Sequence, residues 1–208
     1  MGQAHKLVRS GARLMDHGET QIDIRRPWRA GETLFLLGPG GVGKSTLGRE
    51  LAGVLNWPLI DLDLEFCKRL DLIGPFITRH GYQRYRDENL ALAGVLLSEV
   101  TGPRIFVTAS GFLAAPVGTP DNIEARRLVS TGYGIVLLPS RDIEIATPIV
   151  VERQLQRGFG LQRTSEDQKF RQRFQILINE GDALVISQNL PSEIAVALVD
   201  ALTLPAAA

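Results

Sequence analysis

The stretch that decides the fold is Leu34-Phe35-Leu36-Leu37-Gly38-Pro39-Gly40-Gly41-Val42-Gly43-Lys44-Ser45-Thr46-Leu47. It begins as an apolar run typical of a buried strand, passes through closely spaced glycines and continues as a helical pattern. Gly38, Gly43, Lys44 and Ser45 occupy every fixed position of the phosphate-loop motif G-x-x-x-x-G-K-[ST]. Because the motif requires a strand before it and a helix after it, the sequence predicts a phosphate site here and not an ordinary glycine-rich turn.

The residues of this loop are expected to bind the phosphates of a nucleotide. Extra glycines let backbone N–H groups turn inward around an anion, and the positive end of the following helix adds to the attraction. The lysine can reach the outer phosphates, and the serine hydroxyl is placed to bind Mg²⁺. The predicted nucleotide-binding residues are Gly38, Gly40, Gly41, Val42, Gly43, Lys44, Ser45 and Thr46.

Composition limits the classes of function. The 208 residues suit one domain, here residues 32–208, preceded by an irregular N-terminal extension over residues 1–31. A formal net charge of zero argues against binding to nucleic acid or to a membrane surface, since both need clustered positive charge. The single cysteine, Cys67, excludes an internal disulfide and fits a reducing cytoplasm. No apolar segment approaches the roughly 18 to 20 residues of a membrane span, so we expect a soluble cytoplasmic protein.

Within the extension, only Gln21–Ile24 has a strand pattern. The extension can add a hairpin or an edge strand to the domain. A partly disordered tail is an equal alternative at this point.

Beyond the extension, five apolar strand patterns alternate with helical patterns. This alternation predicts an α/β fold with a five-stranded parallel sheet covered by helices on both faces. The expected strands are residues 33–37, 57–60, 104–108, 134–138 and 183–186, and the expected helices are residues 43–54, 64–70, a helix opening at 81, 122–129, 169–178 and 191–202.

Two aspartates, Asp61 and Asp63, follow the second strand. Alternate side chains of a strand share a face, so both carboxylates can point to one side at the edge where α/β sheets bind ligands. One could hold the water shell of a metal ion while the other reaches an acceptor substrate. The alternative, that Asp63 merely caps the helix at 64–70, stays open.

Two later segments are candidates for ligand contact. The small-residue turn Ala109-Ser110-Gly111 would let a ligand approach the backbone, although an ordinary strand-to-loop turn has the same composition. In residues 148–164, Arg153, Arg157 and Arg163 are interleaved with glycines. This pattern suits a mobile lid over phosphates, and a plain exposed loop is the alternative.

In order and spacing, these motifs resemble those of the shikimate kinase family. After the phosphate loop come Leu-Gly-Arg-Glu-Leu-Ala at 47–52, Asp61-x-Asp63, Gly81-x-x-x-Tyr85-Arg86, Val-Thr-Ala-Ser-Gly at 107–111, the arginine-rich segment, and Arg173 upstream of Ile-Asn-Glu-Gly-Asp-Ala at 178–183. The resemblance covers about residues 33–203. The phosphate loop alone is typical of a large superfamily, whereas the later motifs are much more selective.

The resemblance implies a three-layer, nucleoside-monophosphate-kinase-like fold with a substrate region near residues 62–90 and a lid. Arginine suits the implied carboxylate recognition, because its planar fork can donate two parallel hydrogen bonds. The implied roles are acceptor hydroxyl binding for Asp63, carboxylate binding for Arg86 and Arg173, backbone contact for Ser110 and Gly111, Mg²⁺ binding for Ser45 and Asp61, and nucleotide contact from the lid for Arg157 or, less well matched, Arg153.

The implied activity is transfer of the γ-phosphoryl group of ATP to a hydroxyl of shikimate or a related hydroxylated carboxylic acid, a step of aromatic amino acid biosynthesis. Lys44, Asp63 and Arg157 would be the catalytic residues, with ATP and Mg²⁺ as cofactors. The partner would be the small-molecule hydroxy acid, with no nucleic acid or membrane partner, and the protein would be a monomer or weak homodimer.

The sequence departs from the family pattern at three places. Ala109-Ser110 replaces two glycines of a triple glycine, Asn89 replaces a glutamate, and Arg157-Gly158-Phe159-Gly160 stands in place of Arg-Pro-Leu-Leu. These changes concern the identity of the acceptor substrate more than phosphate binding. They also support an alternative, a catalytically weak sensor or regulatory domain that binds nucleotide or an acidic metabolite.

A third hypothesis is a transport or motor ATPase, since residues 30–38 resemble the start of such a phosphate loop. Against it, the strand at 105–108 ends without an acidic pair, and the chain has no Leu-Ser-Gly-Gly-Gln signature. The loop by itself does not choose among its host families.

Overall fold

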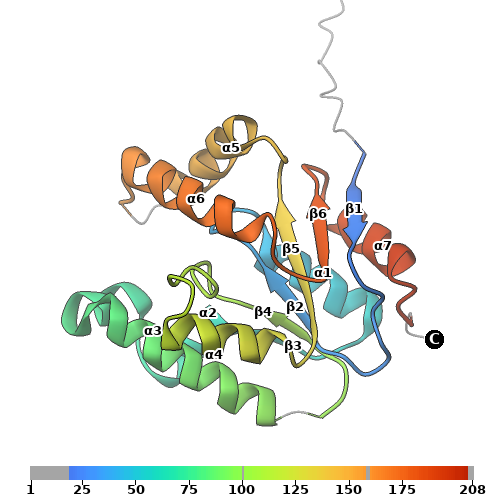
Figure 1. Ribbon diagram of the computed structural model, residues 1–208, viewed down its shortest axis with the longest axis horizontal. Helices are drawn as coiled ribbons and strands as arrows, with labels where there is room; N and C mark the ends of the chain where they lie inside the picture. Colours follow the sequence, from blue (N-terminus) through green and yellow to red (C-terminus); the bar gives the residue numbers. More distant parts are fainter. Residues whose placement is uncertain (1–18, 100, 158–159, 206–208) are drawn as a thin grey trace, which may run out of the picture.

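The computed structural model describes residues 19–99, 101–157 and 160–205 (Figure 1). In these residues six strands form one sheet, in the order β1-β6-β5-β2-β4-β3. The last five strands of that order are parallel to one another, which confirms the predicted α/β sheet. The strands are β1 (Gln21–Ile24), β2 (Leu34–Leu37), β3 (Leu59–Asp61), β4 (Ile105–Val107), β5 (Tyr133–Leu138) and β6 (Ala183–Ile186).

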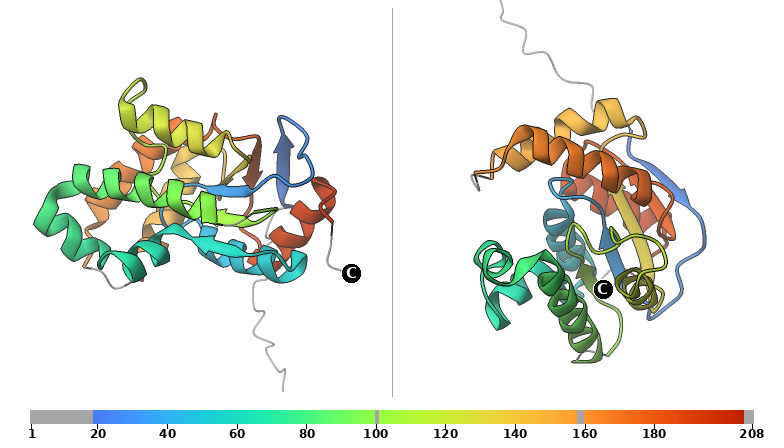
Figure 2. Two further views of the ribbon diagram at one scale, coloured as in Figure 1. Left: turned by 90° about the horizontal axis from the view of Figure 1, so that it is seen from below. Right: turned by 60° about the vertical axis from the view of Figure 1, so that its left-hand side comes forward.

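Helices cover both faces of the sheet, so the three-layer arrangement is also confirmed. Helices α1 and α7 lie on one face, and α3 and α4 lie on the other (Figure 2). The helices are α1 (Lys44–Leu55), α2 (Leu62–Arg69), α3 (Ile73–Glu99), α4 (Pro120–Val129), α5 (Ile143–Leu155), α6 (Arg163–Leu177) and α7 (Pro191–Ala201).

Strand β2 occupies the middle of the sheet, between β4 and β5. Leu34, Phe35 and Leu36 are fully buried. A strand covered on both faces needs apolar side chains at every position, which explains why the sequence shows a continuous run instead of an alternating one. The phosphate loop therefore begins at the carboxyl end of a central strand that is buried on both faces.

Strand β1 adds an antiparallel edge to β6, with Gln21 opposite Ile186. Arg26, just beyond it, donates from Nε to Asp182 at 2.7 Å, and Tyr133 donates its hydroxyl hydrogen to the Arg26 carbonyl at 2.8 Å. The edge-strand alternative is thus confirmed for residues 21–24. Residues 1–18, to which the tail alternative also applied, lie outside the described residues.

The predicted lid at residues 148–164 is wrong in its extent. Helix α5 continues through Pro148 to Leu155, and α6 already begins at Arg163 instead of at residue 169. Val150 and Val151 are buried on α5, so tertiary packing outweighs the helix-breaking tendency of the proline. Only the connection between these helices remains for a lid, and Gly158 and Phe159 lie outside the described residues.

Helix α3 begins at Ile73, eight residues earlier than the expected start at Gly81. It is bent at Gly81, whose φ of 83° and ψ of 160° are not helical. That combination is essentially restricted to glycine. The bend sets the direction of the segment that carries Tyr85 and Arg86.

We expect Gly81→Ala to lower the free energy of unfolding by about 1–3 kcal/mol, because a side chain strains this backbone conformation. An added Cβ at Gly81 has no heavy atom within 4 Å, so the loss would come from the backbone alone. Urea unfolding monitored by circular dichroism measures it. Gly94→Ala is the matched control in the same helix, with equally open space, and should stabilise by about 0.5–1 kcal/mol. Equal effects of the two substitutions would contradict the assignment of the bend to Gly81.

Candidate active site

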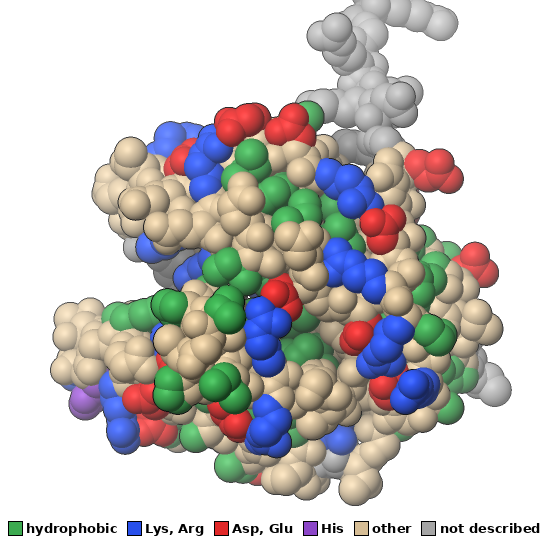
Figure 3. Space-filling model, viewed as in Figure 1, with side chains coloured by type: hydrophobic (Ala, Val, Ile, Leu, Met, Phe, Trp, Pro, Cys, Tyr) green, Lys and Arg blue, Asp and Glu red, His purple; other side chains and the backbone are tan. Residues whose placement is uncertain are grey.

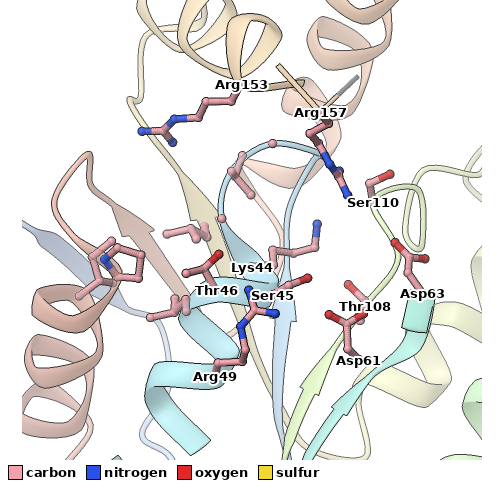
Figure 4. A pocket seen from close by; sticks show the side chains of 18 of the residues that line it. Lys44, Ser45, Thr46, Arg49, Asp61, Asp63, Thr108, Ser110, Arg153 and Arg157 are labelled. Carbon is pink, nitrogen blue, oxygen red and sulfur yellow. The ribbon is translucent and has the colours of Figure 1, made fainter. Parts of the chain in front are cut away.

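A cavity of about 560 Å³ lies at the carboxyl edge of the sheet (Figure 4). Loops that follow several parallel strands line it, which is the expected place for a ligand in an open α/β sheet. Its lining includes Gly40, Gly41, Val42, Gly43, Lys44, Ser45 and Thr46 after β2, Asp61 and Asp63 after β3, Thr108 and Ser110 after β4, and Ser187 and Asn189 after β6. The predicted phosphate-loop residues, except Gly38, therefore line one cavity with the predicted acidic pair.

Two glycines of the loop lie against α5, and the geometry of Gly41 requires glycine. Gly41 has a φ of 82°, and a Cβ there would lie 2.9 Å from the Val150 carbonyl oxygen. A Cβ at Gly40 would lie 2.3 Å from Nε2 of Gln154. The loop consequently packs against α5 with its backbone, and its N–H groups are left to face the cavity.

Lys44 is the charged group at the centre of the loop. Its side chain is buried, and its Nζ donates to the carbonyl oxygens of Gly38 at 2.8 Å and Pro39 at 3.0 Å. Burial lowers the pKa of Lys44 to about 8, against the opposing charges of Asp63 and Asp61. In Figure 4 the ammonium group points into the cavity. Burial destabilises the charged ammonium group, and the negative charge of a bound phosphate would stabilise it.

The two aspartates reach the cavity by different routes. Asp61 ends β3 and caps α2 by accepting from the Leu64 N–H at 3.4 Å, whereas Asp63 lies in the first turn of that helix. The expectation that both belong to one strand face is therefore wrong, because the helix begins at Leu62. The capping alternative for Asp63 is also wrong, since the cap is Asp61.

Asp63 occupies a site suited to handling a proton. Its Oδ1 accepts from the Tyr85 hydroxyl at 3.3 Å. Burial raises the pKa of Asp63, with a further contribution from Asp61, while Lys44 and the Tyr85 hydroxyl oppose the rise. Burial of the Tyr85 hydroxyl and the nearby charge of Asp63 raise the pKa of Tyr85. The hydroxyl therefore stays protonated and can donate a hydrogen bond.

Ser45 and Asp61 supply oxygen atoms to the same cavity, and oxygen is the ligand type that Mg²⁺ prefers. In the described part of the chain, no group of three or more His, Cys, Asp or Glu side chains could hold a metal ion. The residues present therefore fit a Mg²⁺ ion that completes its coordination with phosphate oxygens and water, as this ion commonly does.

The predicted acceptor-binding residues are divided between two cavities. Ser110 lines the first, while Arg86 and Arg173 line a second cavity of about 880 Å³. This second cavity lies between α3, the segment before α4, and α6, on the side seen in Figure 3. Arg173 donates from Nη1 to the Ser110 hydroxyl at 3.1 Å, so the two cavities share this contact as a wall.

Gly111 forms another part of the wall. A Cβ there would lie 2.7 Å from the Tyr82 hydroxyl oxygen, so a larger residue would require the Tyr82 side chain to move. The Gly111 carbonyl accepts from Nη1 of Arg86 at 2.8 Å. The turn at 109–111 therefore accepts hydrogen bonds from both arginines that are predicted to bind a carboxylate.

The two candidate lid arginines both line the first cavity, at the end of α5 and just after it. Figure 4 shows Arg157 directed toward Lys44 and Ser110, and Arg153 directed away from them. Arg157 donates from Nη1 to Oε1 of Gln154 at 3.0 Å. Of the two, Arg157 therefore has the orientation expected of a residue that contacts transferring phosphates.

Sequence reasoning missed several lining residues: Arg49, Leu64, Thr108, Leu137, Ser187, Asn189, Pro191 and Ile194. Ser187 and Asn189 directly follow β6, which ends at Ile186. Their position after a predicted strand could have identified them, because ligands bind at the carboxyl ends of the strands in such sheets. Strand β6 and strand β3 lie on opposite sides of β2 in the strand order. Ser187 and Asn189 therefore line the end of the cavity away from Asp63, where the nucleoside part of a nucleotide would have space.

Known proteins share this sequence pattern and fold. Residues 40–202 match the family model described as shikimate kinase. The pentafunctional AROM polypeptide of Candida glabrata is 30% identical over 132 residues, which make up 61% of this chain. The match spans only 8% of that polypeptide's length.

Solved structures with the same fold include two shikimate kinases. The enzyme from Bacteroides thetaiotaomicron has a TM-score of 0.65 at 22% identity, covering 84% of this chain and 100% of that one. The enzyme from Acinetobacter baumannii, in complex with shikimate, has a TM-score of 0.62 at 20% identity, covering 83% and 93%. A gluconokinase from Sinorhizobium meliloti has a TM-score of 0.58 at 19% identity, covering 84% and 93%. At these identities the likeness shows the fold.

None of the helices in the described ranges is both long and apolar enough to cross a bilayer.

Burial of Lys44 makes a prediction about stability and pH. The pKa of this lysine is 10.5 in a model peptide and about 8 in the fold, so below pH 8 the folded state carries the full cost of the buried cation. Between pH 8 and pH 10.5 the unfolded chain binds more protons than the folded protein, so the free energy of unfolding rises with pH. We expect Lys44→Met, without ligands, to be more stable than the wild type by about 3 kcal/mol at pH 7. The difference should shrink as the pH rises toward 10. A difference in unfolding free energy that stays constant with pH would contradict the buried-cation account.

Proposed function

Because the chain belongs to the shikimate kinase family, we propose that it transfers the γ-phosphoryl group of ATP to a hydroxyl group of shikimate or a related hydroxylated carboxylic acid. The observation that carries the proposal is that Lys44, Ser45 and Asp63 line one cavity. A phosphate-binding cation, a hydroxyl suited to Mg²⁺ and a carboxylate suited to an acceptor hydroxyl are the groups that this reaction needs.

Lys44 and the N–H groups of the phosphate loop would bind the β- and γ-phosphates and offset their charge as the transition state forms. Mg²⁺, when bound at Ser45 and Asp61, would neutralise charge on the phosphate oxygens. Arg157 would approach the same phosphates from the α5–α6 connection. Most of the rate enhancement would thus come from position and electrostatics.

Asp63 would orient the attacking hydroxyl and accept its proton. A raised pKa brings a carboxylate closer to the range in which a general base works at neutral pH. The Tyr85 hydroxyl, which donates to Oδ1 of Asp63, would leave Oδ2 for the acceptor. The acceptor's own carboxylate would lie beyond the wall formed by Ser110 and Gly111, on Arg86 and Arg173.

The proposal is tested by incubating the purified protein with Mg-ATP and shikimate and measuring ADP release. We expect ADP release to depend on shikimate and to fall by at least about 100-fold in Lys44→Ala, since a group that stabilises charge in the transition state contributes on this scale. Gluconate, another hydroxylated carboxylic acid, is the comparison acceptor. ADP release that no acid accelerates would contradict the proposed phosphotransfer.

One observation favours the alternative of a ligand-sensing domain with little catalysis. Arg173 and Ser110 are hydrogen-bonded to each other between the two cavities, so an acceptor that contacts both Asp63 and Arg173 would have to displace this contact. If shikimate raises the melting temperature without turnover, the sensing function becomes the better account. The ATPase hypothesis loses its basis, because membership of the family accounts for the phosphate loop.

A further inference from the structure

Arg86 is held from two sides by groups outside its own helix. Its Nε donates to Oδ2 of Asp121 at 2.9 Å, and its Nη1 donates to the Gly111 carbonyl at 2.8 Å. The side chains of Arg86 and Asp121 are only 9% and 16% exposed. An ion pair with this little solvent contact is screened weakly and has one preferred geometry.

Position 89, where the family pattern has a glutamate, is an uncharged asparagine in this chain and cannot form an ion pair with Arg86. Asn89 lies three residues after Arg86 on α3, close to one turn along the helix. Its side chain is buried, and its Nδ2 has no hydrogen-bond partner among the described residues. Any carboxylate that orients Arg86 must therefore come from another element.

Asp121 supplies that carboxylate from the first turn of α4. A helix N-terminus stabilises a negative charge, and Nε2 of Gln83 donates to the same Oδ2 at 2.8 Å. Hydrogen bonds from Gln83 and Arg86 lower the pKa of Asp121, so the group is an anion at neutral pH. Its charge and position are both fixed before any ligand binds.

We propose that Asp121 is the positioning residue that orients Arg86 toward the carboxylate of the acceptor, in place of the residue at position 89. This inference rests on the proposed function, in which Arg86 binds that carboxylate. The two hydrogen bonds engage Nε and one N–H of Nη1, which leaves one N–H group on Nη1 and two on Nη2. That end of the guanidinium can donate two parallel hydrogen bonds to a carboxylate.

The cavity geometry agrees with this orientation. Arg86, Asp121 and Arg173 line the same cavity of about 880 Å³, so the two arginines can bind one carboxylate there. Without Asp121, the Gly111 carbonyl alone would hold Arg86, and the guanidinium could rotate about its remaining bond. Acid binding would then weaken while nucleotide binding is unchanged.

The test compares steady-state kinetics of the wild type, Asp121→Asn and the double variant Asp121→Asn with Asn89→Glu. We expect Asp121→Asn to raise KM for shikimate about tenfold, and kcat and KM for ATP to change by less than about twofold, because the lost contact orients only the acid-binding arginine. The double variant should recover most of the loss, since a carboxylate introduced at position 89 would meet Arg86 within the helix. Asp87→Asn is the control: this exposed carboxylate also accepts from Gln83, at 3.0 Å.

A KM for shikimate that is the same in Asp121→Asn and Asp87→Asn would overturn the inference and leave the proposed function standing. A recovery that fails in the double variant, with both proteins folded by circular dichroism, would also overturn it.

A wild type that neither binds nor phosphorylates shikimate would instead count against the proposed function for that acid. The Nε–H resonance of Arg86 in a ¹⁵N-resolved NMR spectrum then decides the inference. It should be visible in wild type and Asp87→Asn and broadened by exchange in Asp121→Asn. Equal visibility in all three proteins would overturn the positioning role.

Discussion

The buried ammonium group of Lys44 is the interaction on which the rest of the site depends. Two backbone carbonyls at the start of the loop hold it, and burial lowers its pKa to about 8. This cost is tolerated because β2 is buried on both faces and fixes the loop at the centre of the sheet. An anionic phosphate offsets the cost, so phosphate binding stabilises the loop. Binding energy is therefore available at the place where phosphoryl transfer needs it.

The remaining groups are arranged around this cation by the carboxyl edge of the sheet. Asp61 and Asp63 follow β3, and Ser110 follows β4, so short connections determine their distances from the loop. The side proposed to bind the acid is built differently. Arg86 depends on a bend at Gly81, on the Gly111 carbonyl and on Asp121, which belong to separate elements. The proposed nucleotide side is thus built from short connections, whereas the proposed acceptor side depends on several long-range contacts.

This difference explains what could be predicted from the sequence. The phosphate loop, the parallel sheet and the place of Asp63 in the cavity were accessible, because a local motif or a hydrophobic period encodes each. The expectation that Asp63 shares a strand face with Asp61 was wrong, because α2 begins at Leu62. Over two or three residues, the sequence pattern of a strand end and that of a helix start cannot be told apart. Packing of α5 against α6 makes residues 148–155 helical, although arginines interleaved with glycines over residues 148–164 suggested a lid. Asp121 as a partner of Arg86 was invisible, because 35 residues separate the two and no pattern links them.

Phosphoryl transfer to a carbon-bound hydroxyl is the central claim, and ³¹P NMR of the protein with Mg-ATP and shikimate tests it most directly. The account predicts that the γ-phosphate signal of ATP is replaced by a phosphomonoester signal, coupled to a proton of the acceptor ring, in equal amount to the ADP formed. Inorganic phosphate as the only new phosphate signal would contradict the claim. It would mean that water, and not the acceptor held by Asp63 and Arg86, receives the phosphoryl group.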